Sequence, residues 1–201
     1  MSNKAVLAIG TIKDFDWKNA EVSESRRKKA DSYRFEDDKK RCVLSEVLLK
    51  KALFAFGLNP KEILYEFNEH EKPFLKDFSD VFFSISHSKD YALCIVSDSE
   101  IGIDIEHIED INLNIAKRFF TESEYEAIVS LENDKDRLVK FYDCWTKKEA
   151  YIKWNGKGLS CPLNSFDVYD KLDCEFVTLD SFEDYKCAIC AKEKITNLEV
   201  I

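Results

Sequence analysis

The stretch IGIDIE at residues 101–106 decides the fold that we predict for this chain. Its isoleucines alternate with Gly102, Asp104 and Glu106, which is the period-two pattern of a β-strand with one buried face. The other face is unusual, because Asp104 and Glu106 emerge on the same side, about 7 Å apart. Carboxylates this close repel each other, and neither residue type favours strands. A hard divalent cation would relieve the repulsion, so the pair predicts a site for Mg²⁺, with Mn²⁺ as the other candidate.

The composition is that of a folded, acidic protein. A chain of 201 residues with 45% hydrophobic and 13% aromatic side chains forms one large domain or two small ones, with a sizeable core. The net charge of −9 argues against nucleic acid as the main partner. Two basic clusters, at residues 26–29 and 39–41, interrupt the acidic composition. A local basic patch of this kind suits a small anion.

The cysteines indicate a reducing compartment. Seven cysteines form an odd set without the spacing of a disulfide framework. The apolar run at residues 5–9 is too short for a secretory signal, and no segment reaches membrane-spanning length. We therefore expect a reduced, cytoplasmic protein without membrane association. Cys187 and Cys190 are three apart on a predicted strand and face opposite sides, so core packing is favoured over a zinc or redox pair.

Hydrophobic periodicity divides the chain into alternating elements. Residues 20–35 are predicted to form a short helix followed by a loop, and a short helical turn is predicted to end at residues 118–120. Longer helices are predicted at residues 38–56, 122–131 and 134–154. Strands are predicted at residues 5–9, 63–67, 81–86, 91–97, 101–106, 166–169, 174–179 and 185–191. Thr121 and Glu124 form a capping box that starts one helix. Strands with a packed helix occur on both sides of a boundary near residues 98–100, so antiparallel α+β layers are the expected class.

The long helix carries an acidic residue in the middle of an apolar face. Glu149 would be costly there unless something pairs with it. Lys153, one turn further on, is one candidate partner, and a metal ion shared with Asp104 and Glu106 is the other. The alternative to a metal site is therefore a Glu149–Lys153 ion pair beside a solvent-facing edge strand.

Candidate anion ligands follow the strand predicted at residues 81–86. The hydroxyl of Ser86 and the imidazole of His87 could contact phosphate, although a turn is the simpler role for His87. Gly156 and Gly158 form a loop after the long helix that could approach a ligand closely. This loop lacks the spacing of a nucleotide-binding loop.

Three ordered segments closely resemble the motifs of the Sfp-type 4′-phosphopantetheinyl transferases. They are FSISHS at residues 83–88, IGIDIE at residues 101–106 and WTKKEAYIK at residues 145–153. Further similar segments are Lys72-Pro73, IAKRFF at residues 115–120 and GKGLS at residues 156–160. The resemblance extends from Arg26 to Leu163 and weakens over the remaining residues.

This resemblance implies two similar α/β halves, residues 1–100 and 101–201, related by pseudo-twofold symmetry with the active site at their interface. The first half would mainly bind coenzyme A phosphates and the nucleotide, and the second would supply the metal ligands and the catalytic helix. The implied reaction transfers 4′-phosphopantetheine from coenzyme A to a serine of an apo acyl or peptidyl carrier protein and releases 3′,5′-ADP. Such carriers serve fatty acid, polyketide or nonribosomal peptide biosynthesis, and the enzyme is expected to be a monomer.

Carried over residue by residue, the resemblance makes Asp104, Glu106 and Glu149 the magnesium ligands. Glu149 and Lys153 are the expected catalytic residues, with Lys153 on the pyrophosphate. The expected ligands of coenzyme A are Arg26, Lys29, Arg41, Lys72, Ser86, His87, Asp104 and Lys153. Glu71 departs from the family pattern, which has glycine before Lys-Pro, and glycine permits a positive φ there.

The carrier protein is expected to dock beside the metal. Residues 108–121 follow the metal strand, and Lys117 and Arg118 could steer an acidic carrier. A non-catalytic module that binds coenzyme A or a nucleotide is the alternative function, and it would not need Glu149. A Mg²⁺-dependent phosphohydrolase is a further alternative, which would release product without any carrier.

Overall fold

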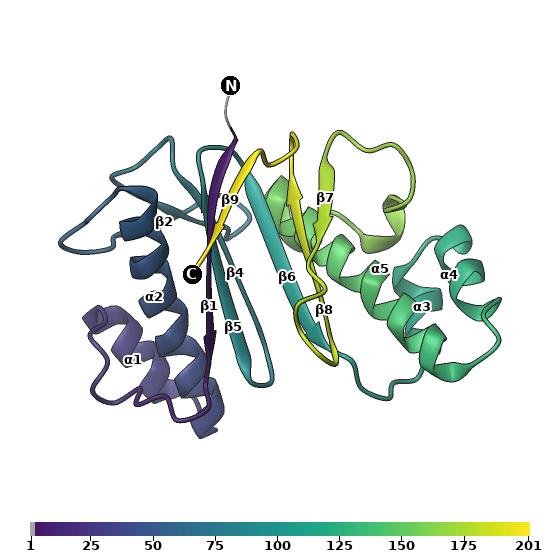
Figure 1. Cartoon of the computed structure of the whole chain (residues 1–201), viewed down its shortest axis with the longest axis horizontal. Helices are drawn as coiled ribbons and strands as arrows, with labels where there is room; N and C mark the ends of the chain where they lie inside the picture. The colour runs from purple at the N-terminus through teal and green to yellow at the C-terminus, as the bar shows by residue number, and fades with distance from the viewer. Residues whose placement is uncertain (1–2) are drawn as a thin grey trace.

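The computed structural model describes residues 3–201, apart from the side chain of Leu159. Four layers make up the protein in the order helices, sheet, sheet, helices (Figure 1). The elements up to the predicted boundary are β1 (Lys4–Thr11), α1 (Glu24–Ser32), α2 (Glu36–Phe56), β2 (Tyr65–Phe67), β3 (Pro73–Leu75), β4 (Phe82–Ser88) and β5 (Tyr91–Ser97). The elements after it are β6 (Ile101–His107), α3 (Asn114–Phe119), α4 (Glu122–Val129), α5 (Asp134–Asn155), two 3-10 turns (Gly158–Ser160 and Leu163–Ser165), β7 (Glu175–Thr178), β8 (Tyr185–Ala191) and β9 (Asn197–Val200).

The first sheet has the strand order β4-β5-β1-β9. β1 is antiparallel to β5 and parallel to β9. The long helix α2 covers its outer face, where Leu48 and Leu53 pack against Val6 and Val96. α2 ends at Gly57, whose φ of 105° is the left-handed conformation that glycine adopts without strain.

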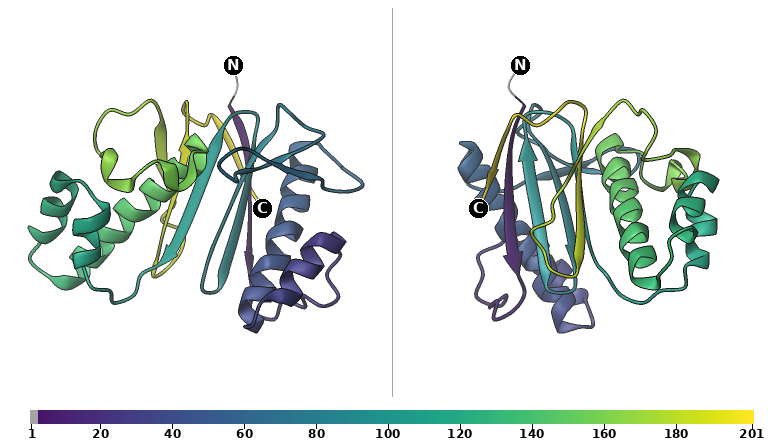
Figure 2. Two further views of the ribbon diagram at one scale, coloured as in Figure 1. Left: turned by 180° about the vertical axis from the view of Figure 1, so that it is seen from behind. Right: turned by 45° about the vertical axis from the view of Figure 1, so that its right-hand side comes forward.

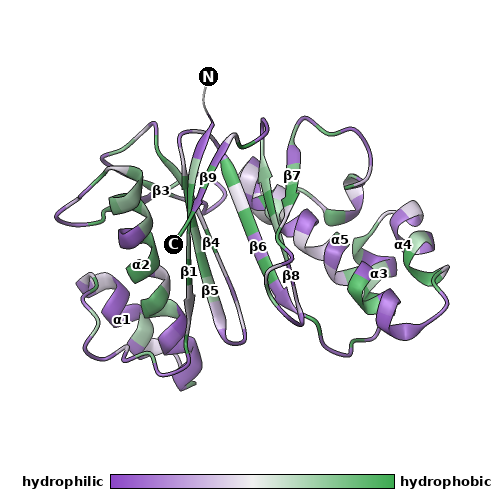
Figure 3. Ribbon diagram, in the orientation of Figure 1, coloured by the Kyte–Doolittle hydropathy of each residue, from purple (hydrophilic) through white to green (hydrophobic). Residues whose placement is uncertain are grey.

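The second sheet has the strand order β6-β8-β7, and the long helix α5 covers its outer face. Its inner face packs on the first sheet, where Ile103 and Ile189 meet Leu7 and Ile95 in the central core. Figure 3 shows the matching hydrophobic bands on the strands of both sheets. Burial of these aliphatic side chains is the main favourable term holding the two sheets together.

The alternation predicted for residues 101–106 is confirmed. Ile101, Ile103 and Ile105 are completely buried between the sheets. The opposite face of β6 lies against α5, and it brings Gly102 into contact with that helix. A Cβ atom on Gly102 would lie 2.0 Å from the carbonyl oxygen of Ala150, so only glycine allows the helix to come this close.

The edge strands β4 and β6 lie side by side, and serine side chains join them. Three backbone amides of β6 donate to three hydroxyls of β4, at 3.1, 3.3 and 3.1 Å: Ile103 N to Ser84 Oγ, Ile105 N to Ser86 Oγ and His107 N to Ser88 Oγ. The sequence separation is 19 in every pair, so the two strands run in the same direction. The two sheets therefore meet through side-chain hydrogen bonds rather than through a backbone ladder.

Most predicted elements are confirmed, including the Thr121–Glu124 capping box. The strand predicted at residues 166–169 is wrong, because this segment is an irregular turn held by side-chain contacts. Two short strands, β3 and β9, were not predicted. β9 returns to the first sheet, so residue 100 does not separate the two sheets completely.

Within residues 3–201, no helix combines the length and the apolar character needed to cross a membrane. The seven cysteines are all free thiols. Cys187 packs between the sheets and Cys190 packs toward α5, which confirms that the two face opposite sides.

The contact at Gly102 gives a test of the fold. We expect Gly102→Ala to lower the free energy of unfolding by about 2–3 kcal/mol, because the new methyl group must push α5 away from β6. Gly10→Ala is the matched control, since its Cβ would meet only the side-chain ends of Leu44 and Leu48, at 3.1 Å. Urea denaturation measures both variants, and equal destabilisation of the two would contradict the close approach at Gly102.

Candidate active site

A cavity of about 370 Å³ opens between the first half and β6. Figure 2 shows α1 and the start of α2 beside the turn that joins β4 to β5, at this end of the molecule. The cavity brings together most of the predicted site residues: Arg26, Lys29, Arg41, Ser86, His87, Asp104, Glu106 and Lys153. Its lining therefore combines four cationic side chains with two of the predicted metal ligands.

The acidic side of the cavity is organised around Asp104, which is 3% exposed. Its Oδ1 accepts hydrogen bonds from Ser86 Oγ and Lys153 Nζ, both at 2.7 Å. Its Oδ2 is buried and has no hydrogen-bond partner among the described residues. Glu106, two residues along β6, accepts a hydrogen bond from Ser88 Oγ at 2.8 Å. A buried carboxylate oxygen without a partner is costly, and it marks a place where a cation would fit.

The titration of the acids supports the same interpretation. Desolvation, and then the charge of Asp104, raise the pKa of Glu106 to about 7. Desolvation and the same aspartate also raise the pKa of Glu149. Glu149 is half-buried on α5 and does not line the cavity, but it lies within electrostatic range of Asp104. The three carboxyl groups thus lie close enough to repel one another, and Lys153 is the cation that partly offsets their charge. A hard cation would suit this region.

The side chains of Asp104, Glu106 and Glu149 do not form a coordination shell in this structure. Among residues 3–201, no group of three His, Cys, Asp or Glu side chains stands in an arrangement that could hold a metal. The ammonium of Lys153 lies on Asp104 instead, and it also donates to the carbonyl of Ile103 at 3.0 Å. The choice of Asp104, Glu106 and Glu149 as ligands therefore stays a prediction.

The alternative based on a Glu149–Lys153 ion pair is wrong in two respects. Lys153 pairs with Asp104 across the interface between α5 and β6, rather than with Glu149 on its own helix. Asp104 is buried, so this face of β6 does not point into solvent.

The basic side of the cavity comes from the first half. Arg41 is held by Asp38 Oδ1 at 2.7 Å and by the carbonyl of Lys89 at 2.8 Å. His87 faces the cavity, and desolvation by the surrounding protein lowers its pKa, with the charges of Arg41 and Lys153 acting in the same direction. The predicted phosphate ligands are thus close together, and an anion is the complementary charge for them.

Lys72 is the predicted ligand that the structure places elsewhere. Its ammonium pairs with Glu100 at 2.6 Å and donates to the carbonyl of Trp154 at 3.1 Å. It lines a second cavity, of about 290 Å³, together with Gly156 and Gly158. Ile85 and Lys153 line both cavities, so the two adjoin each other.

Glu71 occupies the position before Lys72-Pro73 where the family pattern has glycine, and its backbone has the positive φ that glycine permits. Its φ is 64°, in the left-handed region that a side chain other than glycine enters at some cost. The turn before Lys72 therefore keeps the backbone conformation that glycine would adopt without strain.

Comparison with known proteins covers both halves of this chain. Residues 11–100 match the family described as 4′-phosphopantetheinyl transferase, N-terminal, and residues 100–195 match the 4′-phosphopantetheinyl transferase superfamily. The chain is 37% identical over 186 residues to a 4′-phosphopantetheinyl transferase of Bacillus subtilis, with 86% of this chain and 83% of the relative covered. The chain belongs to the 4′-phosphopantetheinyl transferase family.

Other members of the family give the same result. The chain is 36% identical over 200 residues to the 4′-phosphopantetheinyl transferase gsp of Aneurinibacillus migulanus, covering 92% of this chain and 83% of the relative. It is 34% identical over 184 residues to the 4′-phosphopantetheinyl transferase Sfp of Bacillus subtilis strain 168, covering 85% and 82%. The resemblance to the Sfp-type enzymes is confirmed, and the protein is a 4′-phosphopantetheinyl transferase rather than a binding module.

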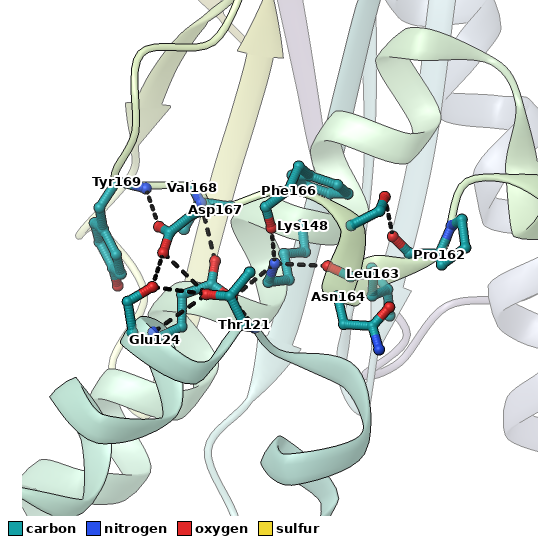
Figure 4. Close-up of polar contacts among 12 residues, drawn as sticks. Thr121, Glu124, Lys148, Pro162, Leu163, Asn164, Phe166, Asp167, Val168 and Tyr169 are labelled. Carbon is teal, nitrogen blue, oxygen red and sulfur yellow. Dashed lines mark hydrogen bonds and ion pairs between the residues drawn. The ribbon is translucent and has the colours of Figure 1, made fainter.

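A buried ion pair supports helix α5 of this transferase, and sequence reasoning missed it (Figure 4). Lys148, next to Glu149 on α5, has a completely buried side chain and pairs with Glu124 of α4 at 2.8 Å. Lys148 also donates to the carbonyls of Leu163 and Phe166, at 2.7 and 2.6 Å. The capping box had already identified Glu124, but nothing in the local sequence distinguishes Lys148 from the neighbouring Lys147, which is less buried.

The same carboxylate also fixes the chain after α5. Glu124 Oε1 accepts a hydrogen bond from Val168 N at 2.9 Å, and Oε2 accepts one from Thr121 N at 2.8 Å. One ion pair therefore connects α4, α5 and the irregular segment that replaces the predicted strand at residues 166–169.

We expect Lys148→Met to destabilise the transferase by about 3–5 kcal/mol, because it leaves Glu124 buried without a counter-charge. Lys28→Met is the control, since Lys28 pairs with Glu24 at the exposed surface. Its loss should cost about 1 kcal/mol or less. Thermal unfolding followed by circular dichroism measures both, and a Lys148 variant as stable as the Lys28 variant would contradict the role of the buried pair.

Proposed function

We propose that this transferase moves 4′-phosphopantetheine from coenzyme A to a serine of an apo acyl or peptidyl carrier protein and releases 3′,5′-ADP. The observation that carries the proposal is the unpartnered Oδ2 of Asp104 beside Glu106, on the wall of a cavity whose other walls are cationic. A phosphate-rich donor and a divalent cation are together complementary to this combination of charges.

Asp104, Glu106 and Glu149 would hold Mg²⁺, or Mn²⁺ in its place. When bound, such an ion supplies charge neutralisation at the pyrophosphate and polarises the phosphorus that is attacked. Ser86 and Ser88 hold the carboxylates of Asp104 and Glu106 by hydrogen bonds, which fixes their orientation before any ligand arrives.

The phosphates of coenzyme A would lie against the basic wall. Arg26, Lys29, Arg41 and His87 all line the cavity there, and Lys153 lines it at the acidic wall. Lys153 is suited to offset charge on the leaving group, because it lines the cavity with its ammonium 2.7 Å from Asp104 Oδ1. Ser86 donates its hydroxyl to Asp104, so its contact with a phosphate of coenzyme A would use the backbone N–H.

The proposed reaction forms a bond between the serine oxygen of the carrier and the β-phosphorus of coenzyme A. The bond from that phosphorus to the 3′,5′-ADP oxygen breaks, and the electron pair leaves with 3′,5′-ADP. The serine proton passes to water, and Glu149 assists by accepting a hydrogen bond from that water.

Docking of the carrier is proposed at residues 108–121, directly after the metal strand. α3 exposes Ile115, Lys117 and Arg118 on this segment, which gives an apolar contact with two cations beside it. An acidic helical carrier complements this surface.

Removal of a metal carboxylate should abolish transfer without unfolding the protein. We expect Asp104→Ala and Glu149→Ala to lose at least about 100-fold in rate, since charge neutralisation at the phosphates is the main contribution to phosphoryl transfer. Glu175→Ala, at an exposed acid of β7, is the control and should keep normal activity. Transfer is measured as the increase in mass of an apo carrier incubated with coenzyme A and Mg²⁺. Near-normal activity of either site variant would contradict the proposed three-carboxylate site.

The histidine of the cavity should make coenzyme A binding depend on pH. His87 has a lowered pKa in the free protein, and a bound phosphate would raise it, so binding takes up a proton. The affinity should therefore increase as the pH falls from 7.5 toward 6. Calorimetry in buffers of different ionisation enthalpy measures the number of protons taken up on binding, for the wild type and for His87→Gln. The difference between the two removes the contribution from titration of coenzyme A itself. Equal proton uptake in the wild type and His87→Gln would exclude this role of His87.

A further inference from the structure

Helix α1 carries two of the cavity cations, Arg26 and Lys29, yet it has little apolar attachment to the rest of the protein. Ala30 is its single buried residue. A helix with so polar a composition needs polar anchors if it is to hold its side chains in one position. The question is what fixes α1 and the guanidinium of Arg26 at the cavity.

Glu46 of α2 provides that anchor. Its side chain is completely buried, although it carries a carboxylate. Oε1 accepts a hydrogen bond from the backbone N–H of Ser23 at 2.6 Å, and Oε2 accepts one from the Ser23 hydroxyl at 2.9 Å. Ser23 is the N-cap of α1, and its Oγ in turn accepts from Arg26 N at 3.2 Å. Glu46 therefore holds the first turn of α1 through both polar groups of its capping residue.

The same carboxylate orients Arg26. Arg26 Nε donates to Glu46 Oε2 at 3.3 Å, and Nη2 donates to the hydroxyl of Tyr65 at 3.3 Å. Nη1 contacts the sulfur of Cys42 at 3.9 Å. The guanidinium is planar and has five N–H donors in a fixed fork, so these contacts fix its plane and leave one N–H on each of Nη1 and Nη2. Because Arg26 lines the cavity, its remaining donors are the ones available to an anion there.

We infer that Glu46 is a positioning residue for coenzyme A phosphates, acting through Arg26. The inference deepens the proposed function and rests on it. Glu46 does not line the cavity, so it acts without contact with the ligand. A glutamine in its place would keep the size of the side chain, but it would remove the charge and turn an amide N–H₂ toward Ser23 or Arg26.

Glu46→Gln should raise the dissociation constant of coenzyme A about tenfold. The substitution removes the charged partner of Arg26, so the guanidinium is no longer held in the direction that binds the phosphate. Isothermal titration calorimetry measures this constant directly. In the transfer assay the KM for coenzyme A should rise by the same factor, while kcat and the KM for the carrier stay unchanged. Glu24→Gln is the matched control, since it removes an exposed ion pair with Lys28 on the same helix, and it should change none of these values.

A double-mutant cycle separates this role from general support of the fold. In an Arg26→Ala background, Glu46→Gln should have almost no further effect on coenzyme A affinity, since the group through which it acts is gone. Additive losses of affinity would overturn the inference. It would also be overturned if Glu46→Gln lowered kcat, or reduced the affinity for the carrier as much as the affinity for coenzyme A.

Two further outcomes keep the test decisive. If Glu46→Gln does not fold, Glu46→Asp replaces it; the shorter carboxylate cannot reach both Ser23 and Arg26, and unchanged coenzyme A affinity in that variant would overturn the inference. If the wild type binds coenzyme A but modifies no carrier, the proposed reaction is wrong, whereas the calorimetric comparison of Glu46→Gln with wild type still decides the role of Glu46.

Discussion

The hydrogen bonds between the serines of β4 and the backbone of β6 are the interaction on which the site depends. An edge strand exposes unpaired N–H groups, and here Ser84, Ser86 and Ser88 satisfy those of β6. A hydroxyl can accept one hydrogen bond and donate another. Ser86 and Ser88 therefore also donate to Asp104 and Glu106. The groups that join the two sheets are thus the groups that orient the acids, and a displacement of one half would disturb both.

The second constraint is the close approach of α5 to β6. Gly102 has no side chain, so the backbone of Ala150 can pack directly over the strand. This contact brings the next turn of the helix near the acids, where Lys153 reaches the carboxylate of Asp104 and the carbonyl of Ile103. On the outer side of the helix, Lys148 fixes α5 to α4 through its buried pair with Glu124. Packing on both sides thus determines where Glu149 and Lys153 stand.

The sequence predicted what depends on local pattern. The alternation of residues 101–106 and the capping box at Thr121 carry their signals within a few residues, and both were confirmed. β9 was missed because its pairing partner, β1, lies almost the whole chain away, and no local pattern encodes a parallel pair. The apolar residues at 166–169 resembled a strand, but Val168 N bonds to Glu124 instead of a neighbouring strand. Lys72 pairs with Glu100, a contact that no spacing along the chain would indicate.

The charges of the cavity are complementary to two ligands at once. Lys153 neutralises one oxygen of Asp104 and leaves the other without a partner, while the pKa values of Glu106 and Glu149 are raised by crowding and desolvation. On the opposite wall, desolvation lowers the pKa of His87, and the charge of Arg41 acts in the same direction, so additional positive charge is disfavoured there. A cation alone would relieve the first wall, and a phosphate alone would relieve the second. If the transferase binds a divalent cation and coenzyme A as proposed, the two together would relieve the repulsion on each side and add their mutual attraction. The arrangement would then favour a metal–pyrophosphate complex over either part by itself.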